Sequence, residues 1–149
     1  MPTAQRVDPY RNFNFLVEID GITQAGFMDC SGFGANTDPI EYREGNENPG
    51  QDPKTMRKLP GMTKYNNIML KWGLTDSREL YDWYRDIGKG KVVRKNGSIV
   101  VLDLEGNEAV RWNFRNGWPT KWDGPDFTSK GNDVAVETLE IAHEGVERA

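Results

Sequence analysis

The chain has few of the residues that form disulfides, metal clusters and nucleophile–base pairs. Its 149 residues include one cysteine, Cys30, and one histidine, His143. A single cysteine excludes a disulfide within the chain and any thiolate metal cluster. Cys30 lies in an extended stretch, Phe27 to Ser31, and is expected to be a small apolar strand residue. His143 stands next to Glu144 at a predicted strand end, which favours a hydrogen-bonded structural role.

Long hydrophobic runs and an excess of positive charge are also missing. No apolar run approaches the length of about 18 residues that a membrane helix needs, and residues 1–8 are polar, unlike a secretion signal. The 19 basic and 23 acidic residues give a net charge of -4 and are spread along the chain, so no basic stripe exists to neutralise a run of phosphates. We therefore expect a cytoplasmic product without stable membrane insertion, for which nucleic acid is not a favoured partner of the isolated subunit.

Hydrophobic residues are scarce too, at 36% of the chain, while glycine occurs 16 times and proline 8 times. An aromatic content of 11% nevertheless argues against a disordered chain. The length is that of one domain, 1–149, which buries enough surface to fold alone. We expect some of its stabilising contacts to come from neighbouring molecules.

The sequence does contain long stretches in which hydrophobic and polar residues alternate, the period of a strand with one face on a core. The first covers residues 13–20, and the turn signal Asp20-Gly21 followed by a second extended stretch, Thr23 to Phe33, predicts a hairpin. Further strands are predicted at 39–43, 65–72, 98–104, 109–115 and 134–143. About seven or eight strands at hairpin spacing predict a mainly β fold, an antiparallel sandwich or barrel.

The predicted strand at 109–115 ends at the turn signal Asn116-Gly117 and has two different faces. One face carries Val110, Trp112 and Phe114, and the other carries Arg111, Asn113 and Arg115. We expect the first set to face the core and the second set to face water. An open sheet of such strands must hide its edges, and pairing with further copies of the chain is one solution.

One flanking helix is predicted at about 76–87. Asp76 and Glu79 resemble a capping box at its start, and Gly88 supplies a stop. Its hydrophobic residues follow the spacing of one helix face. They are Leu80, Trp83, Tyr84 and Ile87.

Residues 44–62 lie between two predicted strands and contain three prolines and three glycines without hydrophobic periodicity. We predict a long extended loop at about 45–62. Loops of this length are uncommon in compact domains and are often functional. The segment ends in Lys58-Leu59-Pro60-Gly61-Met62, and its prolines reduce the entropy lost when it is held by a partner. We therefore interpret it as a docking arm.

Several segments resemble, in the same order, the tube subunits of contractile tails. Arg11 to Gly21 is similar to the opening strand of that family. Ile40 to Gly45 and Lys58 to Tyr65 are similar to the two flanks of its long loop. Trp112 to Pro125 and Glu137 to Gly145 are similar to its closing segments. The resemblance covers nearly the whole chain.

The resemblance implies a single tail-tube domain that forms hexameric rings, stacked into the hollow inner tube of a phage tail or of an extracellular phage-tail-like particle, with the type VI secretion tube as a more distant relative. Strands of adjacent subunits would join around the lumen. The implied partners are further copies, the surrounding sheath protein, the baseplate with tube initiator and terminator proteins, and a cargo of DNA or protein. Such a subunit is made in the bacterial cytoplasm. No enzymatic activity, catalytic residue, metal or cofactor is implied.

The resemblance and the charge pattern together place the contacts between subunits and rings at the two flanks of the long loop. Basic and acidic residues alternate there, which suits a register set by charge complementarity. The predicted contact residues are Tyr42, Arg43, Glu44, Arg57, Lys58, Leu59, Pro60, Gly61 and Lys64.

Two other functions use different residues of the same strands. A monomeric carbohydrate-binding sandwich would use an aromatic platform of Tyr65, Trp72, Trp112, Trp118 and Trp122. An enzyme would need paired acids in one cleft, which spacing along strands does not show. The candidate acids are Asp103, Glu105, Asp123, Asp126, Glu137 and Glu140.

Overall fold

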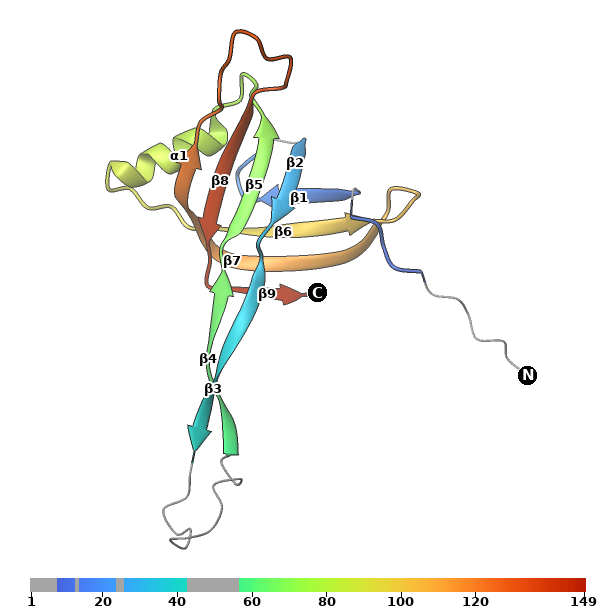
Figure 1. Cartoon of the computed structure of the whole chain (residues 1–149), viewed down its shortest axis with the longest axis vertical. Coiled ribbons are helices and arrows are strands. Elements are labelled where there is room, and N and C mark those ends of the chain that lie inside the picture. The colour runs from blue at the N-terminus through green and yellow to red at the C-terminus, as the bar shows by residue number, and fades with distance from the viewer. Residues whose placement is uncertain (1–7, 13, 24–25, 43–56) are drawn as a thin grey trace, which may run out of the picture.

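The computed structural model describes residues 8–12, 14–23, 26–42 and 57–149, and Figure 1 shows the arrangement of their strands around one helix. Seven strands form one antiparallel sheet in the order β1-β6-β7-β8-β5-β2, with β9 paired to β7, while β3 and β4 form a separate two-stranded ribbon. The predicted mainly β fold with one helix is confirmed. The elements are β1 (Phe15–Ile19), β2 (Phe27–Ser31), β3 (Gly34–Tyr42), β4 (Arg57–Asn66), β5 (Ile68–Gly73), α1 (Glu79–Gly88), β6 (Lys95–Leu102), β7 (Glu108–Asp123), β8 (Val136–Ala142) and β9 (Gly145–Arg148).

The long strand β7 folds the sheet into two layers. Its first half pairs with β6 and β9, and its second half pairs with β8. The strands of the two layers run nearly crosswise in Figure 1. The turn signal Asn116-Gly117 is predicted to end this strand. In the structure the strand bends at Asn116 and continues to Asp123. Asn116 has a φ of 52°, which allows the bend, and Gly117 leaves room for the ring of Phe114.

The hydrophobic core lies between the layers, with β5 and β8 contributing its most buried side chains. On β7, Val110 and Phe114 are buried and Asn113 and Arg115 are exposed, so the predicted core and water faces are confirmed. Trp112 shares the core face but is only partly buried. The buried cluster consists of Ile19, Ile68, Leu70, Trp72, Leu80, Trp83, Ile99, Phe114, Leu139 and Ile141.

Helix α1 closes the core on one side. Leu80 and Trp83 are buried, and the Trp83 indole N–H donates a hydrogen bond of 2.7 Å to the Val93 carbonyl. The helix begins at Glu79, so the predicted capping box from residue 76 is wrong. The Glu79 carboxylate instead accepts two 2.7 Å hydrogen bonds, from the backbone N–H and the hydroxyl of Thr23. These bonds tie the helix to the segment that follows β1.

The predicted hairpin between the first two strands is also wrong. The turn itself forms, with Gly21 at a φ of 75° and the Ile22 N–H bonded to the Ile19 carbonyl at 3.0 Å. However, β1 pairs with β6 and β2 pairs with β5, so the chain crosses from one layer to the other. A local turn signal fixes where the chain turns, but the hydrogen-bond partners of β1 and β2 come from strands farther along the chain.

Within the described residues, no helix is long and apolar enough to cross a membrane.

Candidate assembly surfaces

The strands β3 and β4 form a ribbon that projects from the body of the molecule (Figure 1). Residues 57–62 were predicted to belong to a loop, with a strand only at 39–43; the structure corrects both, because β3 begins at Gly34 and β4 at Arg57. Pro39 stands opposite Pro60. Each strand of a two-stranded ribbon is an edge strand, and edge strands tolerate proline. The rest of the predicted loop lies outside the described residues.

A β-bulge divides the ribbon into two halves. Beyond the pair of Thr37 and Thr63, one residue of β3, Asp38, stands opposite two residues of β4, Gly61 and Met62. A Cβ atom on Gly61 would lie 2.6 Å from the Asp38 carbonyl oxygen. This close approach requires glycine. Gly61 therefore acts through the backbone. It permits the bulge that sets which side chains of the outer half lie on each face of the ribbon.

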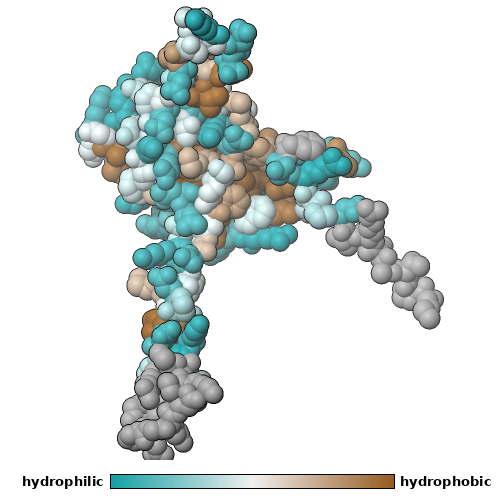
Figure 2. Space-filling view, viewed as in Figure 1, coloured by the Kyte–Doolittle hydropathy of each residue, from teal (hydrophilic) through white to brown (hydrophobic). Residues whose placement is uncertain are grey.

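The outer half of the ribbon carries hydrophobic side chains on one face. Ile40 pairs with Leu59 and Tyr42 pairs with Arg57, so these four residues share that face. Ile40 is 53% exposed, Leu59 45% and Tyr42 46%. The opposite face carries the pair of Glu41 and Lys58. Figure 2 shows hydrophobic surface on this ribbon among hydrophilic residues.

An exposed apolar row is costly on an element of this kind. An isolated two-stranded ribbon is marginally stable in water. Full burial of one Ile or Leu side chain contributes about 1.5–3 kcal/mol, and roughly half of that is still available at Ile40 and Leu59. The ribbon therefore gains stability from any surface that covers this face.

The predicted contact residues occupy different parts of the ribbon. Tyr42, Arg57 and Leu59 come together on its apolar face, whereas Lys58 lies on the charged face. Ile40 lies on the same apolar face but is not among the predicted residues, and its alternation with Tyr42 was the available signal. Pro60 and Gly61 adjoin the bulge. Lys64 is exposed and stands opposite Asn36, nearer the body. Arg43 and Glu44 lie outside the described residues.

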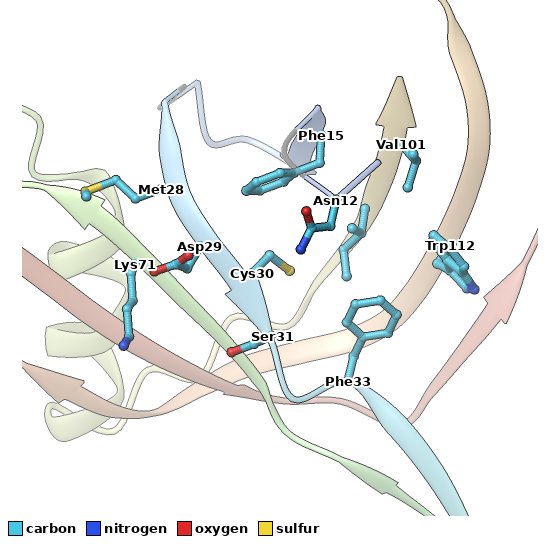
Figure 3. A pocket seen from close by; sticks show the side chains of 11 residues that line it. Asn12, Phe15, Met28, Asp29, Cys30, Ser31, Phe33, Lys71, Val101 and Trp112 are labelled. Atoms are coloured by element: carbon cyan, nitrogen blue, oxygen red, sulfur yellow. The ribbon is translucent and has the colours of Figure 1, made fainter. Parts of the chain in front are cut away.

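The side of the core away from α1 is open. A cavity of about 710 Å³ lies there between the layers, and Figure 3 shows Phe15, Cys30, Phe33 and Trp112 around it, with Lys71 on the other side of β2. The rings of Phe33 and Trp112 are 5.6 Å apart. Burial raises the pKa of the Cys30 thiol to about 12. The thiol is therefore protonated at neutral pH, which confirms the prediction of a small apolar strand residue.

The candidate catalytic groups are dispersed. Glu137 accepts a 3.0 Å hydrogen bond from the Trp122 indole N–H, and Glu140 accepts one of 3.0 Å from the Asn67 amide. His143 Nε2 lies 2.8 Å from the Asn66 carbonyl oxygen, as expected of a structural histidine. Within the described residues, no group of three or more His, Cys, Asp or Glu side chains is placed to hold a metal ion.

The aromatic platform that the alternative carbohydrate-binding function would need is not assembled. All five tryptophans lie in the described part of the chain, and each is buried or partly buried. Trp72 is 2% exposed, and Trp112 lines the cavity between the layers. Trp118 and Trp122 line a separate groove beside α1. The aromatic side chains therefore support packing in different places instead of forming one exposed surface for a sugar ring.

Known proteins share this architecture. Residues 11–147 match the family model of the T4-like virus tail tube protein gp19. A chain of the sheath-tube complex of an extracellular contractile injection system, PVC, in its extended state is similar with a TM-score of 0.80 and 28% identity, over 95% of this chain and 91% of that chain. A chain of the PVC sheath/tube terminator has a TM-score of 0.83 and 29% identity, over 96% and 98%.

A more distant likeness concerns the fold alone. Hcp1 from Flavobacterium johnsoniae has a TM-score of 0.54 and 17% identity, over 91% of this chain and 94% of that chain. No curated protein sequence matches the chain.

Proposed function

Since the chain belongs to the family of the T4-like virus tail tube protein, we propose that it forms hexameric rings that stack into the hollow inner tube of a contractile tail or injection particle. Its role in a tube is structural. Sheath contraction drives the tube through a target envelope, and the lumen conducts DNA or protein. The mechanism is geometric and uses no catalytic residue, metal or cofactor.

The observation that supports this proposal is the projecting ribbon with its apolar row, Ile40, Leu59 and Tyr42. The row lies on the outer half of a ribbon that projects from the body (Figure 1), and we infer that a second copy of the chain covers it. A contact between unlike surfaces of identical chains repeats without limit unless rotation closes it into a ring. A ribbon that reaches the next ring provides such a repeating contact. Because each ring contacts the next in the same way, the rings stack into a tube.

The partners that we propose rest on the family and on the solved relatives. Copies of the chain cover the ribbon and the open side of the core. A sheath protein surrounds the tube, and initiator and terminator proteins bind its ends at the baseplate and at the far end. The solved relatives support this assignment, since they belong to a sheath-tube complex and a sheath/tube terminator. The subunit is made in the bacterial cytoplasm and incorporated into the particle.

The proposal is tested on the apolar row. In the double variant Ile40→Asp with Leu59→Asp, the row becomes charged, so we expect folded subunits that still form rings but no longer stack into tubes. The readout is negative-stain microscopy, with circular dichroism to show that the body is folded. The control is Glu41→Gln on the opposite face, which should leave tubes intact. Tubes of normal length from the Asp variant would contradict the docking role of the ribbon.

A further inference from the structure

We propose that neighbouring copies within a ring are joined by the β6–β7 turn of one copy, with Leu104 at its tip, which inserts into the groove beside α1 of the next copy. This inference rests on the proposed function, because it identifies the contact that closes the ring. It concerns surfaces other than the β3–β4 ribbon.

The turn presents Leu104 rigidly. Leu104 is 82% exposed. The Asp103 carboxylate accepts hydrogen bonds from the backbone N–H groups of Glu105 at 2.9 Å and Asn107 at 2.8 Å. The N–H of Gly106, which has a φ of 86°, donates to the Asp103 carbonyl at 3.1 Å. A single exposed leucine is ordinary, but one held on a hydrogen-bonded turn loses little conformational entropy on binding.

The groove is a ready-made apolar receptor. It has a volume of about 400 Å³ and lies between α1 and the second half of β7. The rings of Tyr81 and Trp122 meet edge to face at 5.1 Å and fix one wall. Large apolar side chains with few polar groups are the surroundings that a leucine side chain prefers. The groove is lined by Tyr81, Tyr84, Ile87, Gly88, Trp118, Pro119 and Trp122, with Arg85 and Thr120 as its polar members.

The charges around the two surfaces are complementary. Residues 102–108 contain Asp103, Glu105 and Glu108 and no basic residue; Glu108 pairs with Arg111 of β7, so Asp103 and Glu105 carry the charge of the turn. Residues 85–94 contain four basic residues against Asp86; Arg85 pairs with Asp82 at 3.4 Å and Arg94 with Glu144 at 3.9 Å, so the charge offered to a neighbour comes from the two lysines. Lys89 directly follows Gly88 of the groove. Opposite charge around an apolar contact favours one docking orientation over others. The basic residues are Arg85, Lys89, Lys91 and Arg94.

The two surfaces also lie on opposite sides of the molecule. In Figure 1 the helix is at the left of the body and the β6–β7 turn at the right, whereas the ribbon points downward. Each copy therefore carries both a turn and a groove, so that side-by-side copies can repeat one contact until a rotation closes the ring. Contacts within a ring and contacts between rings then use different surfaces.

Two complementary variants test the contact. Leu104→Asp places a charge at the tip of an exposed turn. Gly88→Trp fills the groove, and the backbone tolerates it because a Cβ atom at Gly88 meets nothing within 4 Å. Each variant is combined with Ile40→Asp and Leu59→Asp, which remove the ribbon contact, and alone is then expected to remain monomeric, since one half of every contact within the ring is lost. Mixed in equal amounts, they are expected to give one dimer and no larger species, because only the turn of Gly88→Trp and the groove of Leu104→Asp are intact.

Sedimentation velocity measures these species, and circular dichroism shows that both variants are folded. Leu74→Asp, which alters another exposed leucine, is the control and is expected to form rings as the wild type does. Rings from Leu104→Asp or Gly88→Trp alone would overturn the contact while leaving the tube function intact. So would a mixture that stays monomeric while the wild type forms rings. A wild-type chain that never forms rings would instead overturn the proposed function.

Discussion

At the scale of the residue, some glycines are required because a neighbouring atom leaves no space for a side chain, and others are not. A Cβ atom on Gly97 of β6 would lie 2.6 Å from the Glu18 carbonyl oxygen and would clash with the edge of the Phe114 ring. We expect Gly97→Ala to lower the free energy of unfolding by about 1–3 kcal/mol, the usual cost of overpacking a core. Gly88→Ala is the control, because its Cβ meets open space and alanine favours a helix. Urea denaturation of the monomer measures both, and equal stabilities would contradict the packing at Gly97.

At the scale of the element, the β3–β4 ribbon depends on its bulge. Gly61→Ala brings a Cβ atom against the Asp38 carbonyl, so the outer half of the ribbon must shift or turn its apolar row. We expect the body to keep its unfolding midpoint while the yield of tubes in a sedimentation assay falls. Asp38→Ala is the matched control, since it keeps the backbone carbonyl and changes only an exposed side chain. Normal tubes from Gly61→Ala would show that the bulge does not orient the row.

At the scale of the whole molecule, stability is unevenly distributed. Ile68, Leu70, Leu139 and Ile141 have no exposed surface, whereas most of the ribbon is exposed. Hydrogen exchange measured by mass spectrometry should therefore be fast in the ribbon of the free subunit and slowest in β5 and β8. Assembly should slow exchange in the ribbon selectively, because a neighbouring copy covers it. Equal exchange of the ribbon in free and assembled protein would contradict that burial.

The sequence predicted much of the fold because its strands alternate clearly. The two faces of β7 follow from the alternation of Val110 and Phe114 with Arg111 and Arg115, and the helix follows from the spacing of Leu80 and Trp83. Its start was misplaced because Glu79 bonds to Thr23, which is distant in sequence. The ribbon was misread as a loop because prolines usually interrupt strands, yet an edge strand tolerates them.

Local chemistry in the sequence determined which segments are extended, which faces are apolar and where the chain needs glycine, since these depend on neighbouring residues alone. The resemblance to the tail tube family was likewise visible in the sequence, because several similar segments occur in the same order. Only the tertiary structure decided that β1 pairs with β6, that Asn116 bends a continuous strand, and that the β6–β7 turn and α1 lie on opposite sides of the body. Strand partners and the relative placement of surfaces depend on contacts between residues far apart in the chain, and no local pattern encodes them.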